Sequence, residues 1–258
     1  MDTTFFGLEP GTSVGVLVTG IAAIAMFAFI TVLARRWRSY WWTSMAFIVA
    51  GGGSLALGSY LAVRSFMSSI AGMATTGGGI YSVWFGCWQS TQPVLAGAWL
   101  AMLMTLFGGV FVLRGSPHEI TLRAGVRSKS TAIFALFAGL ALTGGAASVV
   151  LYRRAITFVL WAITPQAQTL GHPSTPLHDV TDHLFAAAAV SACCLTIVIV
   201  LLVSTVLIAR RTSPSRTFFV VTVIALLASF GISGAFVVNL HSLSNRFRTA
   251  ALTGKMSE

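Results

Sequence analysis

The chain has 258 residues, of which 56% are apolar and only 9% are charged, and its mean hydropathy is +0.86. In soluble domains about a quarter of the residues are charged, so this composition disfavours a soluble fold and indicates an integral membrane protein. The net charge of +10 indicates anionic lipid, rather than nucleic acid, as the partner of the basic residues.

Six stretches are long and apolar enough to span a bilayer, which requires about 20 residues. They cover residues 13–34, 43–64, 93–113, 130–152, 184–209 and 217–240. The third is predicted to begin at Pro93, because the missing N–H of proline is harmless in a first helical turn. We therefore predict an all-α, polytopic integral membrane protein whose six transmembrane helices form a single domain over residues 1–258.

The loops after the first, third and fifth stretches hold ten basic residues and one acidic residue, Glu119. The basic residues are Arg35, Arg36, Arg38, Arg114, Arg123, Arg127, Lys129, Arg210, Arg211 and Arg216. The positive-inside rule then places both termini on the non-cytoplasmic side of a cell membrane or an organellar inner membrane. The C-terminal cluster of Arg246, Arg248 and Lys255 opposes this orientation mildly.

Five arginines of these loops are predicted to bind anionic lipid head groups. Each contributes a favourable free energy of about 1 kcal/mol near the membrane surface. They are Arg35, Arg36, Arg38, Arg210 and Arg211. The first, third and fifth helices are bulky and end in arginine, whereas the others are rich in small residues. This alternation indicates three weakly repeated helical hairpins, although the positive-inside rule alone also generates arginine at those ends.

Small residues recur at helical spacing in the second and fourth stretches. Such stripes allow the close backbone approach on which helix association in lipid depends. The two stripes are Ala46, Ala50, Ser54 and Gly58, and then Ala135, Gly139, Thr143 and Ala147. We expect them to form the packed interior of the bundle, or to face another subunit.

Two longer loops are expected on the outer side, at residues 66–91 and 153–182. The first contains Tyr81, Trp84 and Trp88, a composition suited to the head-group region. Either loop can hold an interfacial helix, or the preceding spanning helix can project beyond the membrane.

The strongest candidate for chemistry lies at the outer mouth of the fifth helix: His178, Asp179, Asp182 and His183. In a helix, His178 and Asp182 lie one turn apart, as do Asp179 and His183, so imidazole and carboxylate pairs can bind a transition metal. The alternative is an N-terminal helix turn in which an aspartate caps the helix or complements its dipole.

None of the six stretches carries an ionisable residue at its centre, which disfavours a proton pump or a voltage sensor. No motif identifies a substrate, a reaction or a cofactor. The favoured hypothesis is a non-enzymatic, multi-pass subunit that packs with other membrane protein subunits. The alternatives are a small-solute transporter or channel built from hairpins, and a membrane metalloprotein that uses the His/Asp cluster.

Overall fold

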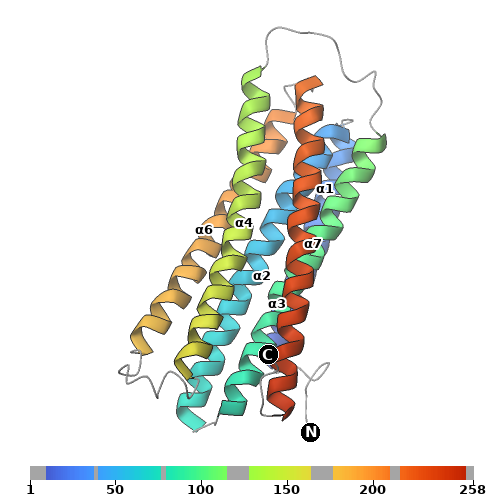
Figure 1. The fold of residues 1–258 in the computed structure, drawn as a ribbon. Helices are drawn as coiled ribbons and strands as arrows, with labels where there is room; N and C mark the ends of the chain where they lie inside the picture. The colour runs from blue at the N-terminus through green and yellow to red at the C-terminus, as the bar shows by residue number, and fades with distance from the viewer. Residues whose placement is uncertain are drawn as a thin grey trace.

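The computed structural model describes residues 10–37, 40–76, 80–114, 128–163, 177–209 and 216–253, and all of them are α-helical (Figure 1). The helices are α1 (Pro10–Trp37), α2 (Tyr40–Thr76), α3 (Ile80–Arg114), α4 (Ser128–Ile163), α6 (Leu177–Ala209) and α7 (Arg216–Thr253). All six contain a segment long and apolar enough to cross a membrane. The prediction of an all-α membrane protein with six candidate spans is confirmed.

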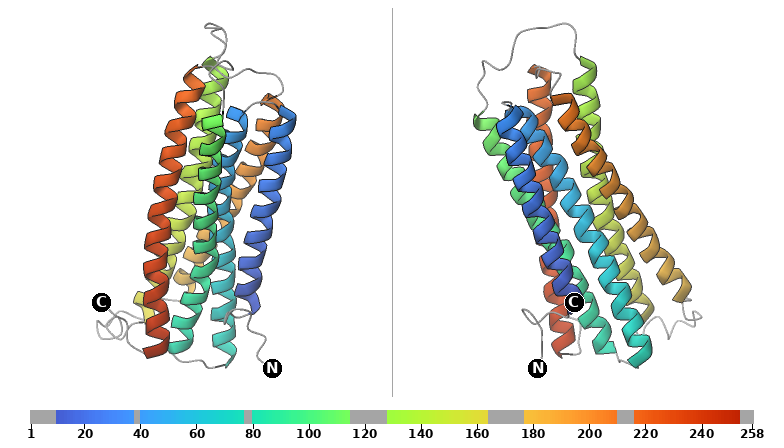
Figure 2. Two further views of the ribbon diagram at one scale, coloured as in Figure 1. Left: turned by 90° about the vertical axis from the view of Figure 1, so that its right-hand side faces the viewer. Right: turned by 180° about the vertical axis from the view of Figure 1, so that it is seen from behind.

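The helices run alternately in opposite directions in one elongated bundle (Figures 1 and 2). α1 begins and α7 ends at the same end of the bundle, which we call the terminal end. α1, α3 and α6 finish at the opposite end, which we call the basic end because Arg114 and the predicted basic loops follow there. The side of the membrane that each end faces stays a prediction.

α2 is the central helix of the bundle. Every residue from 42 to 56 is buried, and α2 contacts each of the other five helices. Glycines permit this close packing, because a Cβ on Gly58 would meet the Pro93 carbonyl oxygen of α3 at 2.6 Å. α1, α6 and α7 are peripheral and expose large apolar side chains such as Ile24, Val200 and Leu227, which is the surface a bilayer requires.

The helices are longer at the terminal end than the apolar stretches predicted. α2 continues to Thr76 and α3 begins at Ile80, so the predicted outer loop at 66–91 is helical throughout its described residues. α4 continues to Ile163, and α6 begins at Leu177. In both places the described residues continue the spanning helices and form no separate interfacial helix. Whether these continuations project beyond the membrane stays a prediction.

The prediction that the third helix begins at Pro93 is wrong, because α3 starts 13 residues earlier and Pro93 lies inside it. The preceding turns are held by tertiary packing: Trp84 is only 6% exposed, and its ring lies 6.4 Å from that of Phe247 on α7. Neighbouring helices commonly stabilise membrane helices across an internal proline in this way.

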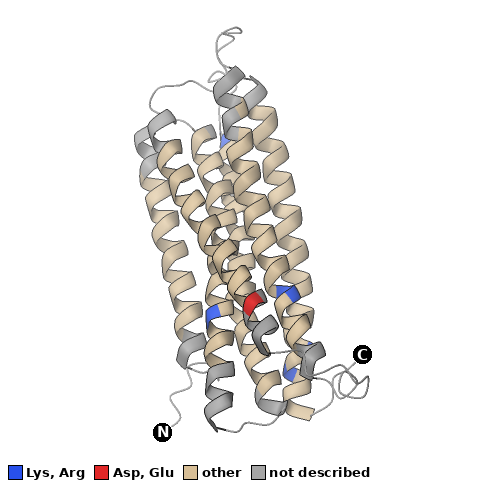
Figure 3. Cartoon of the chain, turned by 90° about the vertical axis from the view of Figure 1, so that its left-hand side faces the viewer, with Lys and Arg blue, Asp and Glu red and all other residues tan. Residues whose placement is uncertain are grey.

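The terminal end has its own apolar core, which includes Phe66, Trp84 and Phe247 from three helices. The exposed charges on the described helices lie at the basic end and in the terminal half of the bundle, with the middle free of them (Figure 3). They are Arg64, Arg114, Arg153, Arg154, Asp182, Arg246 and Arg248.

A helix of 37 residues such as α2 is about 55 Å long, whereas the hydrocarbon core of a bilayer is about 30 Å thick. Arg64, 12 residues before the end of α2, is the one charged residue of that helix, so we expect the excess length at the terminal end.

Candidate functional site

The predicted His/Asp cluster falls in the first two turns of α6. Residues 178–183 are therefore helical, which puts His178 above Asp182 and Asp179 above His183 in the i, i+4 register. The structure describes the side chain of Asp182, which is exposed, but not those of the other three residues. Among the described residues, no group of three His, Cys, Asp or Glu side chains is placed to hold a metal. Metal binding by the cluster stays a prediction.

Two of the five predicted lipid-binding arginines lie on a described helix, at the basic end. Arg35 and Arg36 belong to the last turn of α1, and their side chains lie outside the described residues. Arg38, Arg210 and Arg211 also lie outside the described residues. Arg114 ends α3 at the same end of the bundle and is exposed there.

The predicted small-residue stripe of α2 lies in the interior of the bundle. Ala46, Ala50, Ser54 and Gly58 are all buried. The contact with α3 is made backbone to backbone, since a Cβ on Gly97 would lie 2.5 Å from the Ser54 carbonyl oxygen. Ser54 Oγ donates a hydrogen bond to the Ala50 carbonyl oxygen at 3.0 Å, which satisfies the hydroxyl within the helix.

The predicted stripe of α4 lies largely outside that interior. Ala135 is half-buried, Gly139 has open space where a Cβ would stand, and Thr143 and Ala147 are exposed. α4 packs on α2 through a neighbouring stripe that includes Ala138, Ala141 and Gly145. Of the two roles predicted for this stripe, packing within the bundle does not apply to Gly139, Thr143 and Ala147, and contact with another subunit stays a prediction.

A buried hydroxyl network joins α3 to α4 in the terminal half of the bundle. Tyr152 Oη lies 2.9 Å from Ser90 Oγ and 3.3 Å from Thr91 Oγ1. Both α3 hydroxyls donate to the carbonyl oxygen of Cys87, at 3.0 and 2.7 Å. These partners are hydroxyls and a backbone carbonyl rather than a general acid and a general base. The composition of the network is therefore that of a structural contact between two helices.

Two further polar contacts join α3 to α7. Gln92 Nε2 donates to Ser244 Oγ at 2.9 Å, and Thr105 Oγ1 lies 2.9 Å from Ser229 Oγ. Thr105 also donates to the carbonyl oxygen of Ala101, within its own helix. Interhelical polar pairs of this kind contribute about 0.6 kcal/mol each in membrane proteins.

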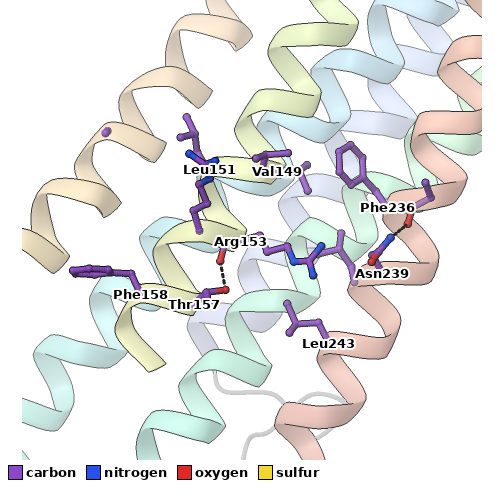
Figure 4. Close-up of a pocket in the computed structure, with 13 residues that line it drawn as sticks. Val149, Leu151, Arg153, Thr157, Phe158, Phe236, Asn239 and Leu243 are labelled. Carbon is purple, nitrogen blue, oxygen red and sulfur yellow. Dashed lines mark hydrogen bonds between the residues drawn. The ribbon is translucent and has the colours of Figure 1, made fainter. Parts of the chain in front are cut away.

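A groove of about 770 Å³ opens between α4, α6 and α7 and is the main candidate site (Figure 4). Most of its wall is apolar, and its two charged lining residues are both arginines. The lining residues are Val149, Val150, Leu151, Arg153, Arg154, Thr157, Phe158, Ala186, Ala235, Phe236, Asn239, Leu240 and Leu243. Pockets of about 300–1,000 Å³ with apolar walls and a few polar groups are the usual form of small-molecule sites.

The polar side chains of the groove lie together on facing helices. Figure 4 shows the Arg153 side chain between α4 and α7, on the side where Asn239 lies. Asn239 Nδ2 donates to the Ala235 carbonyl oxygen at 2.9 Å, and Thr157 Oγ1 donates to the Arg153 carbonyl oxygen at 2.9 Å. Sequence reasoning did not predict this groove. Its one sequence signal is the adjacent pair Arg153 and Arg154 in a chain poor in charge.

Comparison with known proteins gives no match to a family model, to a curated sequence or to a solved structure. Neither a family nor a related protein therefore supplies a function for this chain. Its function has to be inferred from the geometry of the described helices and from the properties of the bilayer.

Proposed function

We propose that this chain is a non-enzymatic, multi-pass subunit of a larger membrane protein assembly. The proposal is carried by one observation: small residues lie on outward faces of α4 and α7 with no neighbour in the described part of this chain. At Gly139 on α4, and at both Gly231 and Gly234 on α7, an added Cβ would have nothing within 4 Å. We call these three glycines, with Thr143 and Ala147, the small-residue face.

Contact with lipid and contact with protein place different requirements on a helix surface. Lipid-facing positions need only be apolar, and bulky side chains serve there, as on α1 and α6 of this chain. Helix contacts in lipid instead use small residues, which let two backbones approach. Glycine also lowers helix stability by about 0.5–1 kcal/mol relative to alanine, so outward glycines bring a cost that a partner helix offsets.

The packing of the centre favours a subunit over a transporter. α2 occupies the middle of the bundle and is buried on all sides between residues 42 and 56. Polar side chains in this packing meet other side chains: the Thr105 hydroxyl meets that of Ser229, and the Ser90 hydroxyl meets that of Tyr152. A solute path needs polar groups that face an open cavity, and the groove described above opens on the side of the bundle instead.

The proposal includes the membrane orientation. We propose that the basic end faces the cytoplasm, or the corresponding organellar compartment, and contacts anionic lipid there. The projecting terminal end then lies on the other side, where α2, α3, α4 and α7 extend beyond the hydrocarbon core.

The test compares the native chain with one in which the small-residue face is blocked. The full chain is purified in mild detergent from the membrane of its own cell, and its mass is measured in the native state. We expect a complex of fixed stoichiometry, well above the 27.3 kDa of one chain. Gly139→Leu with Gly231→Leu is expected to release the partner, because each leucine fills the space into which a partner helix packs.

The chain offers a matched control. Gly20 on α1 and Gly109 on α3 also have open space at the Cβ position, but the exposed residue one turn later is bulky, Ile24 and Leu113, rather than small. Gly20→Leu with Gly109→Leu therefore makes the same chemical change and should leave the complex intact. A monomeric wild-type chain, or equal loss of the complex in both double variants, would refute the proposal.

A further inference from the structure

We propose that the groove between α4, α6 and α7 binds one anionic phospholipid, with the phosphate at Arg153 and Arg154 and an acyl chain along the apolar wall. This inference is independent of the subunit proposal. It concerns a bound molecule, whereas the subunit proposal concerns the small-residue face.

The depth of the two arginines along the bundle calls for an anionic partner. Arg153 and Arg154 lie nine residues or more before the end of α4, within the part of the helix that is long and apolar enough to span the membrane. Arginine in such a position is stable only where it reaches the interface or meets an anionic partner. A lipid phosphate at the boundary of the hydrocarbon core meets that requirement.

The wall of the groove divides into a polar and an apolar part. Along α4, Val149 lies toward the middle of the bundle from Arg153, and Phe236 lies at the corresponding part of α7 (Figure 4). This wall suits hydrocarbon. Arginine presents a planar fork of donors that matches phosphate oxygens, so the arginine pair suits a lipid head group.

The surface around the groove is strongly apolar. Phe185 on α6 is 61% exposed and Val238 on α7 is 70% exposed, and each is adjacent in sequence to the helix face that lines the groove. Large exposed apolar residues of spanning helices face acyl chains. The groove is therefore open to the bilayer, which makes a lipid its occupant rather than a water-soluble anion.

The charge of the lining residues selects the class of lipid. Arg153 and Arg154 give the groove two positive charges, and no acidic residue is among the described residues that line it. A zwitterionic head group brings its own cation to this site, whereas an anionic head group does not. Each arginine near an anionic surface raises the affinity about fivefold, so the pair is expected to favour the anionic lipid over the zwitterionic one by about 25-fold.

The test uses the purified full chain in mild detergent, titrated with dioleoyl phosphatidylglycerol or dioleoyl phosphatidylcholine and analysed by native mass spectrometry. The wild type is expected to retain the anionic lipid in preference to the zwitterionic one. Arg153→Gln with Arg154→Gln should lose one tightly held anionic lipid. Arg246→Gln with Arg248→Gln is the matched control, because these exposed arginines of α7 do not line the groove.

Two further measurements separate the parts of the proposal. Ala235→Trp fills the apolar wall from an exposed position without entering the core, and it should weaken retention of either lipid. Millimolar inorganic phosphate should not displace the bound phosphatidylglycerol. The proposal fails if the wild type holds the two lipids equally, if both arginine pairs give the same loss, if Ala235→Trp retains lipid as the wild type does, or if free phosphate displaces it.

Discussion

The backbone contact between α2 and α3 gives the sharpest test of the fold. A Cβ added at Gly58 of α2 would lie 2.6 Å from the Pro93 carbonyl oxygen and 3.2 Å from the Gly97 Cα of α3. Ordinary carbon contacts are about 3.5–4.0 Å, so Gly58→Ala forces the two backbones apart by roughly 1 Å. Neither obstructing atom is the end of a flexible side chain, and no rotamer change can relieve the clash.

The magnitude follows from two opposing effects. Overpacking of a well-packed site lowers the free energy of unfolding by about 1–3 kcal/mol. Replacing glycine by alanine in a helix raises it by about 0.5–1 kcal/mol. We therefore expect Gly58→Ala to lower the free energy of unfolding by about 1–2 kcal/mol. Gly109→Ala is the control, since nothing lies within 4 Å of its Cβ position, and it should raise the free energy by about 0.5–1 kcal/mol.

The assay is unfolding by sodium dodecyl sulfate in bicelles, followed by the fluorescence of the seven tryptophans. Gly97→Ala, whose Cβ would lie 2.5 Å from the Ser54 carbonyl oxygen, should behave like Gly58→Ala. The double variant should lose less than the sum of the two, because one separation of α2 from α3 relieves both clashes. Equal stability of Gly58→Ala and Gly109→Ala would refute the close contact.

Three further predictions concern the terminal half of the bundle. Tyr152→Phe removes the hydroxyl that meets Ser90 and should lower the free energy of unfolding by about 1 kcal/mol in the same assay, since Ser90 keeps its backbone acceptor. Phe247→Ala should lower it by about 3–5 kcal/mol, because this ring is fully buried in the core of the terminal end; a loss under about 1 kcal/mol would contradict that core. Labelling in vesicles by a membrane-impermeant maleimide should modify Leu252→Cys but spare Val238→Cys in a cysteine-free background, although the two positions are 77% and 70% exposed. Equal labelling would place both positions in the same solvent and contradict the projection of α7.

The six spanning helices could be predicted from the sequence because a bilayer selects strongly for length and hydropathy. The extent of the helices could not. Residues 80–92 lack a continuous apolar run, and a proline follows them, yet they are helical because Trp84 packs against Phe247, which is 163 positions away in the chain. Hydropathy reports apolar segments, and it carries no signal for the contacts between helices that extend them.

The packing face of α4 illustrates a second limit. α4 has small residues on several sides, including Gly139, Ala141, Gly145 and Ala147. Spacing alone identifies more than one stripe that a neighbour could use, and the structure places Ala141 and Gly145 against α2. On α2 the residues of the predicted stripe are all buried, as is every residue from 42 to 56, so burial there does not distinguish one stripe from another.

The groove lay beyond prediction for a related reason. Its three walls come from α4, α6 and α7, and the arrangement of these helices is fixed by their separate contacts with α2 and α3. In the sequence, Arg153 and Arg154 resemble residues at the end of a span, where arginine is common. Only the position of Asn239 and Phe236 across from them turns the pair into part of a site.

The enclosure of residues 42–56 of α2 has a consequence for biogenesis. α2 is the second helix to be synthesised, but four of the five helices that surround it come later in the chain. At about 5–20 residues per second, the end of α7 follows the end of α2 by about 10–35 s. During that interval a glycine-rich helix, shaped to contact protein on every side, is in contact with lipid or with the insertion machinery. Synthesis of this chain therefore includes a period in which its central helix lacks most of its final protein contacts.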